Sequence, residues 1–286
     1  MMKTQIKYIA SSGNTYDLTT KDILTRVGDY YDWSWKPEGA KRQYGSRVSS
    51  FSRDAAQYEP ELIFGRNQKG LRKLIQALHN DFENDMRRLK PGRIVWGDWY
   101  LDCFINASKV DNISYWKWIS NQIQVYAPYP FWIKEEKVVL DSAASAGQTP
   151  TSGEFLDYPY DYEYDYTASV IGEKNVYSES PFTSEFRLVI YGEAVNPRIV
   201  INGYPYVLYT TIPSGAYVIV DSREKTITMY QNGQRTNIFD FRNKSDSIFE
   251  KIPAGNLHIV WDSAFGADLT IFREQSEPEF EEVPYE

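Results

Sequence analysis

The sequence predicts a mainly β protein of two domains, and three observations support this fold class. Short runs of alternating apolar and polar residues recur along the chain, and turn-forming clusters separate them. Aromatic residues make up 16% of the 286 residues, and such rings favour strands and large interfaces. The length exceeds what one all-β core comfortably holds, so we expect two domains of ordinary size.

The first domain is expected over residues 1–141, as a β-sandwich with one helix. The spacing predicts an amphipathic helix from about residue 68 to residue 89, with charged residues, Asp81 and Asp85 among them, between the apolar ones. Its apolar stripe repeats every three or four positions: Leu71, Leu74, Ile75, Leu78, Phe82, Met86 and Leu89. A strand is predicted before the helix at residues 5–8, and others after it at 93–96, 99–105, 118–126 and 131–140.

A linker is expected over residues 142–153, because this stretch holds only small or turn-forming residues and has no apolar periodicity. A long exposed loop inside one domain is the competing interpretation. The second domain then covers residues 154–286. Its short strands and the turn pairs Asn202-Gly203 and Asn232-Gly233, which are typical of type I′ hairpins, predict a β-sandwich or jelly roll.

Every second residue is tyrosine at the start of the second domain, so five rings would project from one strand face. They are Tyr158, Tyr160, Tyr162, Tyr164 and Tyr166. The plain interpretation is a sandwich strand with an aromatic inner face. The alternative is a candidate docking or sugar-stacking face, and it is the one binding site that the sequence suggests.

The net charge of −8 argues against nucleic acid as the main partner, because phosphate binding requires a basic face. The single cysteine, Cys103, lies in an apolar run, which predicts a buried thiol and favours folding in a cytoplasmic environment. The first residues contain no apolar signal region, and no run of eighteen apolar residues occurs. No membrane partner is therefore expected.

No catalytic motif is convincing, so the chain is not expected to be an enzyme, and no metal or cofactor is expected. The two histidines, His79 and His258, have no second ligand nearby in sequence and are interpreted as surface or packing residues. A cell-wall glycosidase using acids such as Asp161, Glu163 or Asp165 is the minority hypothesis. The acidic tail, residues 274–286, is interpreted as a solvated end, with a docking strand as the alternative.

Several segments, in order along nearly the whole chain, resemble the distal tail (Dit) family of siphophages. The similar features in the first half are the strand-rich start, the single helix, and the segments 97–101 and 125–132. In the second half they are segments 158–162, 252–257, 265–271 and 272–274.

The resemblance implies an N-terminal ring-forming β-sandwich and a C-terminal galectin-like β-sandwich. It also implies a structural role in the virion, as a hexameric ring at the tail tip or baseplate that is assembled in the host cytoplasm. The implied partners are other copies of the chain, the tail tube protein, a tail-associated fibre or spike protein and a receptor-binding protein. A carbohydrate-binding module for host cell-wall saccharide is the alternative function.

Overall fold

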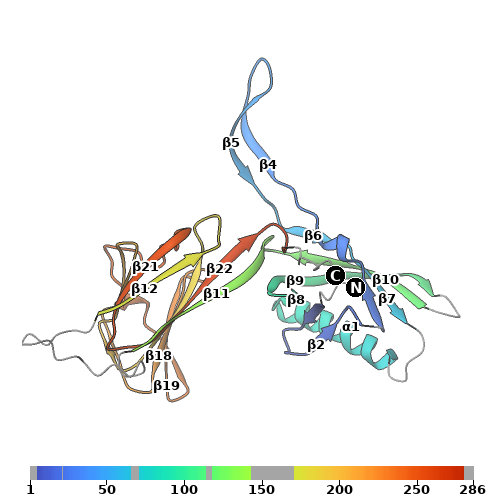
Figure 1. The fold of residues 1–286 in the computed structure, drawn as a ribbon. Helices are drawn as coiled ribbons and strands as arrows, with labels where there is room; N and C mark the ends of the chain where they lie inside the picture. Colours follow the sequence, from blue (N-terminus) through green and yellow to red (C-terminus); the bar gives the residue numbers. More distant parts are fainter. Residues whose placement is uncertain (1–4, 21, 66–70, 114–117, 143–170, 280–286) are drawn as a thin grey trace, which may run out of the picture. The chain divides into compact units, whose positions relative to one another are not determined.

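A computed structural model describes residues 5–20, 22–65, 71–113, 118–142 and 171–279 (Figure 1). The predicted fold class is confirmed: the described chain is mainly antiparallel β structure with a single α-helix. It forms two compact units, the first made of residues 1–134 and 274–286 and the second of residues 135–273. Each unit is described separately below.

The first unit contains two antiparallel sheets that share one long strand. One sheet has the order β2-β1-β8-β9-β11, and the other joins β3, β7, β10 and β6, with β10 also pairing β9. A 3-10 turn, η1 (Val27–Tyr30), follows β3. The strands are β1 (Ile6–Ile9), β2 (Thr15–Asp17), β3 (Ile23–Thr25), β6 (Ala56–Tyr58), β7 (Glu61–Gly65), β8 (Gly92–Trp96), β9 (Trp99–Ile113), β10 (Trp118–Ala127) and β11 (Trp132–Leu140).

The single helix, α1 (Leu71–Arg88), packs against β9 and confirms the predicted amphipathic helix. Leu78 is fully buried, and the ring of Phe82 meets Tyr8 of β1 edge-on, with 4.9 Å between ring centroids. The predicted stripe is wrong at two positions, because Leu74 is 36% exposed and Leu89, at its C-terminal end, is 83% exposed. Leu89 leaves the helical conformation at φ 52° and so ends the helix.

The polar face of α1 was also predicted wrongly at two positions, since Asp81 and Asp85 are buried. Both carboxylates find hydrogen-bond donors beneath the helix, which removes the usual penalty for burying a charge. The helix therefore contacts the sheet through apolar and acidic side chains together.

The second unit is a β-sandwich. One sheet has the order β22-β13-β18-β19-β20, and the other has the order β12-β21-β15-β16. A small pair, β14 with β17, and a 3-10 turn, η2 (Phe239–Phe241), complete the unit. The strands are β12 (Ile171–Ser178), β13 (Phe186–Tyr191), β14 (Ala194–Val195), β15 (Arg198–Ile201), β16 (Tyr204–Val207), β17 (Thr211–Ile212), β18 (Tyr217–Asp221), β19 (Thr226–Gln231), β20 (Gln234–Asn237), β21 (Gly255–Asp262) and β22 (Ala267–Gln275).

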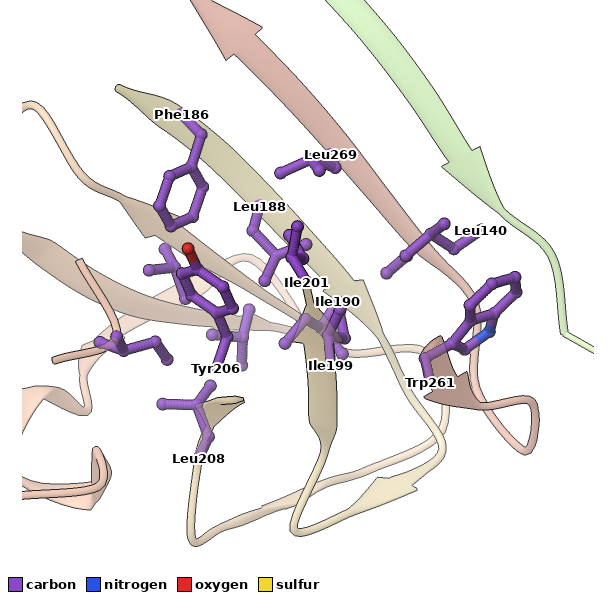
Figure 2. Packing of buried hydrophobic residues seen from close by; sticks show 14 of the residues in the cluster. Leu140, Phe186, Leu188, Ile190, Ile199, Ile201, Tyr206, Leu208, Trp261 and Leu269 are labelled. Atoms are coloured by element: carbon purple, nitrogen blue, oxygen red, sulfur yellow. The ribbon is translucent and has the colours of Figure 1, made fainter. Parts of the chain in front are cut away.

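The core of this sandwich lies between its two sheets and is mainly aliphatic, with aromatic rings such as Phe186, Tyr206 and Trp261 among the aliphatic side chains. Figure 2 shows Leu188 and Ile190 of β13 pointing toward Ile199 and Ile201 of β15, and all four are buried. Period-two alternation produces this layer, because every second side chain of each strand points inward. The β15–β16 turn contains the predicted Asn202-Gly203 pair at positive φ, so this hairpin prediction is confirmed.

The division between the units falls within β11. Trp132 belongs to the core of the first unit, whereas Val138 and Leu140 belong to the core of the second. The linker predicted at residues 142–153 lies outside the described residues except for Ser142, so it stays a prediction. The chain belongs to the first unit again after Arg273. The predicted domain bounds, 1–141 and 154–286, stay a prediction.

Candidate assembly surfaces

A two-stranded hairpin in the first unit pairs with no other described strand (Figure 1). It consists of β4 (Lys36–Lys41) and β5 (Ser46–Ser52), and every residue of the two strands is exposed except the half-buried Ser52. An isolated hairpin is only marginally stable in water. A long exposed hairpin is therefore a candidate surface for contact with another molecule.

The tip of the hairpin combines an aromatic ring with positive charge. Tyr44 is 87% exposed, and residues 41–47 contain three basic residues and no acidic one: Lys41, Arg42 and Arg47. Further down β5, Phe51 is 59% exposed. Tyrosine and arginine are among the residue types that are enriched at the energetically important positions of protein interfaces.

The base of the hairpin is fixed by ring and charge contacts. The guanidinium of Arg53 lies over the ring of Phe131, 4.9 Å from its centroid, and donates a hydrogen bond to Ser276 Oγ at 2.9 Å. Burial lowers the pKa of Arg53. Lys36 pairs with Asp54 beside a cavity of about 240 Å³. The contacts of Arg53 hold the hairpin to the body of the first unit, whereas the Lys36–Asp54 pair joins the two strands at the base of the hairpin.

The acidic tail is not a solvated end where the structure describes it. Tyr129 donates a hydrogen bond of 2.6 Å to Glu274, Arg53 holds Ser276, and Pro278 is buried. The interpretation as a solvated end is therefore wrong for residues 274–278, which pack on the first unit.

Buried carboxylates join α1 to the β1–β2 hairpin. Asp85 accepts hydrogen bonds from the hydroxyls of Tyr8 and Ser11 and from the backbone N–H of Ser11. Asp81 accepts one of 2.6 Å from the Tyr16 hydroxyl. Burial and the carboxylates raise the pKa of Tyr8 and raise the pKa of Tyr16 to about 12, so both phenols remain donors.

A row of tyrosines crosses the outer face of the second unit's larger sheet. Tyr191 lies opposite Tyr217, which lies opposite Tyr230 on the next strand. The rings of Tyr217 and Tyr230 stack, with centroids 5.0 Å apart and planes within 9°. Tyr191 donates a hydrogen bond of 2.7 Å to Asp268, which raises the pKa of Tyr191. This row was not predicted from the sequence, because its members come from separate strands.

The predicted tyrosine face lies outside the described residues, so it stays a prediction. This applies to Tyr158, Tyr160, Tyr162, Tyr164 and Tyr166 and also to the acids Asp161, Glu163 and Asp165.

The remaining candidate groups are described. Cys103 is fully buried, as predicted, and burial raises the pKa of its thiol. His79 is half-buried within hydrogen-bonding distance of Asn121, and burial lowers the pKa of its imidazole. His258 is exposed and lies 2.8 Å from Glu173.

Among the described residues, no group of three or more His, Cys, Asp or Glu side chains could hold a metal ion. No helix in the described residues is both long enough and apolar enough to cross a membrane.

No protein-family model and no curated protein matches the chain in sequence. In fold, the chain is similar to phage tail hub and baseplate proteins. One is the SPP1 Dit (gp 19.1) protein, described as a paradigm of the hub adsorption apparatus in Gram-positive infecting phages. It is 11% identical, with a TM-score of 0.59, and the match covers 96% of this chain and 100% of that one.

Two structures of the phage P2 baseplate in its activated conformation, with Ca and with Sr, are also similar. Each matched chain is 13% identical with a TM-score of 0.63, over 97% of this chain and 100% of that one. The Dit-like two-domain β fold that the sequence suggested is therefore confirmed.

Proposed function

We propose that this chain is a structural subunit of a bacteriophage tail tip or baseplate, located in the virion. The observation that carries this proposal is the fold similarity to a hub protein and to baseplate chains over their whole length. A structural role also favours a protein without enzymatic activity. Mass spectrometry of purified virions would detect the chain in the particle, and its absence from intact virions would contradict the proposal.

We propose further that copies of the chain close into a hexameric ring hub, assembled in the host cytoplasm. The ring would connect the tail tube protein to a tail-associated fibre or spike protein and to a receptor-binding protein. A ring needs a heterologous contact, in which one surface of each subunit meets a different surface of the next. The β4–β5 hairpin supports such a contact, because it is exposed and carries Tyr44 and Phe51.

Light scattering on the purified chain tests the ring. The expected particle contains about six subunits, and the double variant Tyr44→Ala with Phe51→Ala should shift the population toward monomers. The control is Phe182→Ala, which removes a ring that is 74% exposed in the second unit and should leave the particle unchanged.

A monomer at high protein concentration, alone and mixed with tail tube protein, would contradict the ring. A hexamer that survives the double hairpin substitution would keep the ring and exclude the hairpin as its contact.

The second candidate function is recognition of a host cell-wall saccharide. The observation that favours it is the tyrosine row on the outer face of the second unit. The segment from Tyr158 to Tyr166 stays a further proposed docking or sugar-stacking face. Glycosidase action would release reducing ends from wall material, and we expect no release.

A further inference from the structure

The outer face of the sheet β22-β13-β18-β19-β20 presents a binding surface with fixed geometry. Tyr191, Tyr217 and Tyr230 occupy directly opposed positions on three adjacent strands, so their side chains emerge on the same face. Tyr191 is 41% exposed and Tyr217 is 36% exposed. The Tyr217–Tyr230 stack holds both rings in one orientation, which reduces the entropy lost when a ligand binds.

Polar groups border this row on both sides. At one end of the row, Asp268 accepts a hydrogen bond from the Tyr191 hydroxyl. At the other end, the exposed Arg235 lies opposite Tyr230. Beside the row, Val189 and Ile219 face each other as half-buried residues. The surface thus combines rings and aliphatic groups with a few hydrogen-bonding groups of both kinds, the usual composition of a site for a small polar ligand.

The area of the row fits a small ligand better than a protein. A tyrosine contributes about 150–250 Å² when fully buried, so three rings at these exposures offer roughly 250 Å² or less. A stable protein interface buries about 800 Å² on each partner. The row alone therefore falls well short of a protein interface.

The charge of the surrounding unit selects among small ligands. The described residues of this unit, 135–142 and 171–273, contain 14 acidic and 11 basic residues, so their net charge of −3 disfavours a polyanion. A neutral sugar carries no such penalty. Its C–H face packs on an aromatic ring, and its hydroxyls exchange hydrogen bonds with carboxylate, guanidinium and phenol groups.

We propose that the row Tyr191, Tyr217 and Tyr230, with Asp268 and Arg235 at its ends, binds a neutral oligosaccharide. This inference rests on the second candidate function and names its site. The ligand lies across the strands and contacts the exposed parts of the rings, and the polar residues at the two ends set its orientation.

Isothermal titration of the full chain tests this site with chitohexaose, maltohexaose, a galactan oligomer and, as the polyanion, poly(glycerol phosphate). The expected result is binding of at least one neutral oligomer and none of the polyanion. Tyr217→Ala and Tyr230→Ala should each weaken that binding about tenfold or more, whereas Tyr217→Phe should keep most of it. Tyr177→Ala is the matched control, because Tyr177 is 67% exposed on the other sheet. This variant should bind the oligomer with unchanged affinity.

Two results would contradict the proposed site. One is that no neutral oligomer binds at millimolar concentration, and the other is that binding is unchanged by the substitutions at Tyr217 and Tyr230. Circular dichroism on each variant shows whether the sandwich still folds. Light scattering on the same samples separates this inference from the assembly proposal. If the chain forms a hexamer but binds no sugar, the proposed sugar site is contradicted and the ring is kept. If the chain binds sugar as a monomer, the proposed ring is contradicted and the sugar site is kept.

Discussion

Replacing Asp85 by alanine should destabilise the first unit strongly. Its buried carboxylate accepts hydrogen bonds from the hydroxyls of Tyr8 and Ser11 and from the backbone N–H of Ser11. Hydrogen bonds to a charged group are worth about 1.5–3 kcal/mol each, and a buried donor left without a partner costs about 1–3 kcal/mol. Three donors lose their acceptor together and the terms are not additive, so we expect a total loss of about 3–5 kcal/mol.

Thermal unfolding followed by circular dichroism at 222 nm measures the effect, since the α-helix of the described chain lies in the first unit. In a domain of this size, 1 kcal/mol lowers Tm by about 2–4 °C. Asp85→Ala should therefore lower Tm by roughly 6–20 °C. Glu83→Ala is the control on the same helix, because Glu83 is exposed and forms an ion pair with the exposed Arg87, a contact worth about 0.5 kcal/mol or less.

A loss below about 1 kcal/mol for Asp85→Ala, or equal losses for the two variants, would contradict this account of the buried network. Tyr8→Phe provides a further check. It should cost less than Asp85→Ala, because the carboxylate keeps both of its bonds to Ser11.

Three other perturbations have defined outcomes. Folding raises the pKa of Tyr16 from an ordinary value of 10.0 to about 12. The protonated phenol therefore contributes stability that is fully present below pH 10 and is lost between pH 10 and 12. Tyr16→Phe should flatten that part of a curve of Tm against pH. Gly172→Ala should destabilise the second unit by about 1–3 kcal/mol in urea unfolding, because its Cβ would lie 2.5 Å from the Trp261 ring. Gly39→Ala should reduce the fraction of the proposed hexamer in light scattering with little change in Tm, since its Cβ would lie 1.9 Å from the Arg47 carbonyl oxygen within the exposed hairpin.

Elements with local signals could be predicted from the sequence. The helix follows from its apolar period, and the β19–β20 hairpin follows from Asn232-Gly233, where both residues take positive φ. The strands β8, β10 and β11 also match their predicted ranges closely. Each of these elements has a sequence signal made of residues near one another in the chain.

Features that depend on distant contacts could not be predicted in the same way. Asp81 and Asp85 share a helix face with Leu78 and Phe82, and this spacing was the one available signal for their burial. Their donors, such as Tyr16, lie more than sixty residues away. An acidic residue is assigned to solvent unless such a partner is known.

The tyrosine row illustrates the same limit in a sheet. Tyr217 and Tyr230 lie on consecutive strands, so a hairpin register could have paired them. Tyr191 joins the row only because β13 pairs with β18, and no local pattern specifies that neighbour. The boundary between the two units within β11 could not be predicted for a similar reason. One continuous strand supplies Trp132 to the core of the first unit and Leu140 to the core of the second.

The buried carboxylates of α1 have a consequence for assembly. Apolar packing is non-directional, so a purely hydrophobic helix face could settle in more than one position on the sheet. Asp81 and Asp85 lie four residues apart, which is about one turn, or 5.4 Å, so a shift of α1 by one turn would carry one of the two carboxylates away from its donors. We infer that this network fixes one position of the helix at some cost in stability. If the ring proposed above forms, each subunit must present the same surfaces to its neighbours, and one fixed helix position serves that requirement more directly than additional stability does.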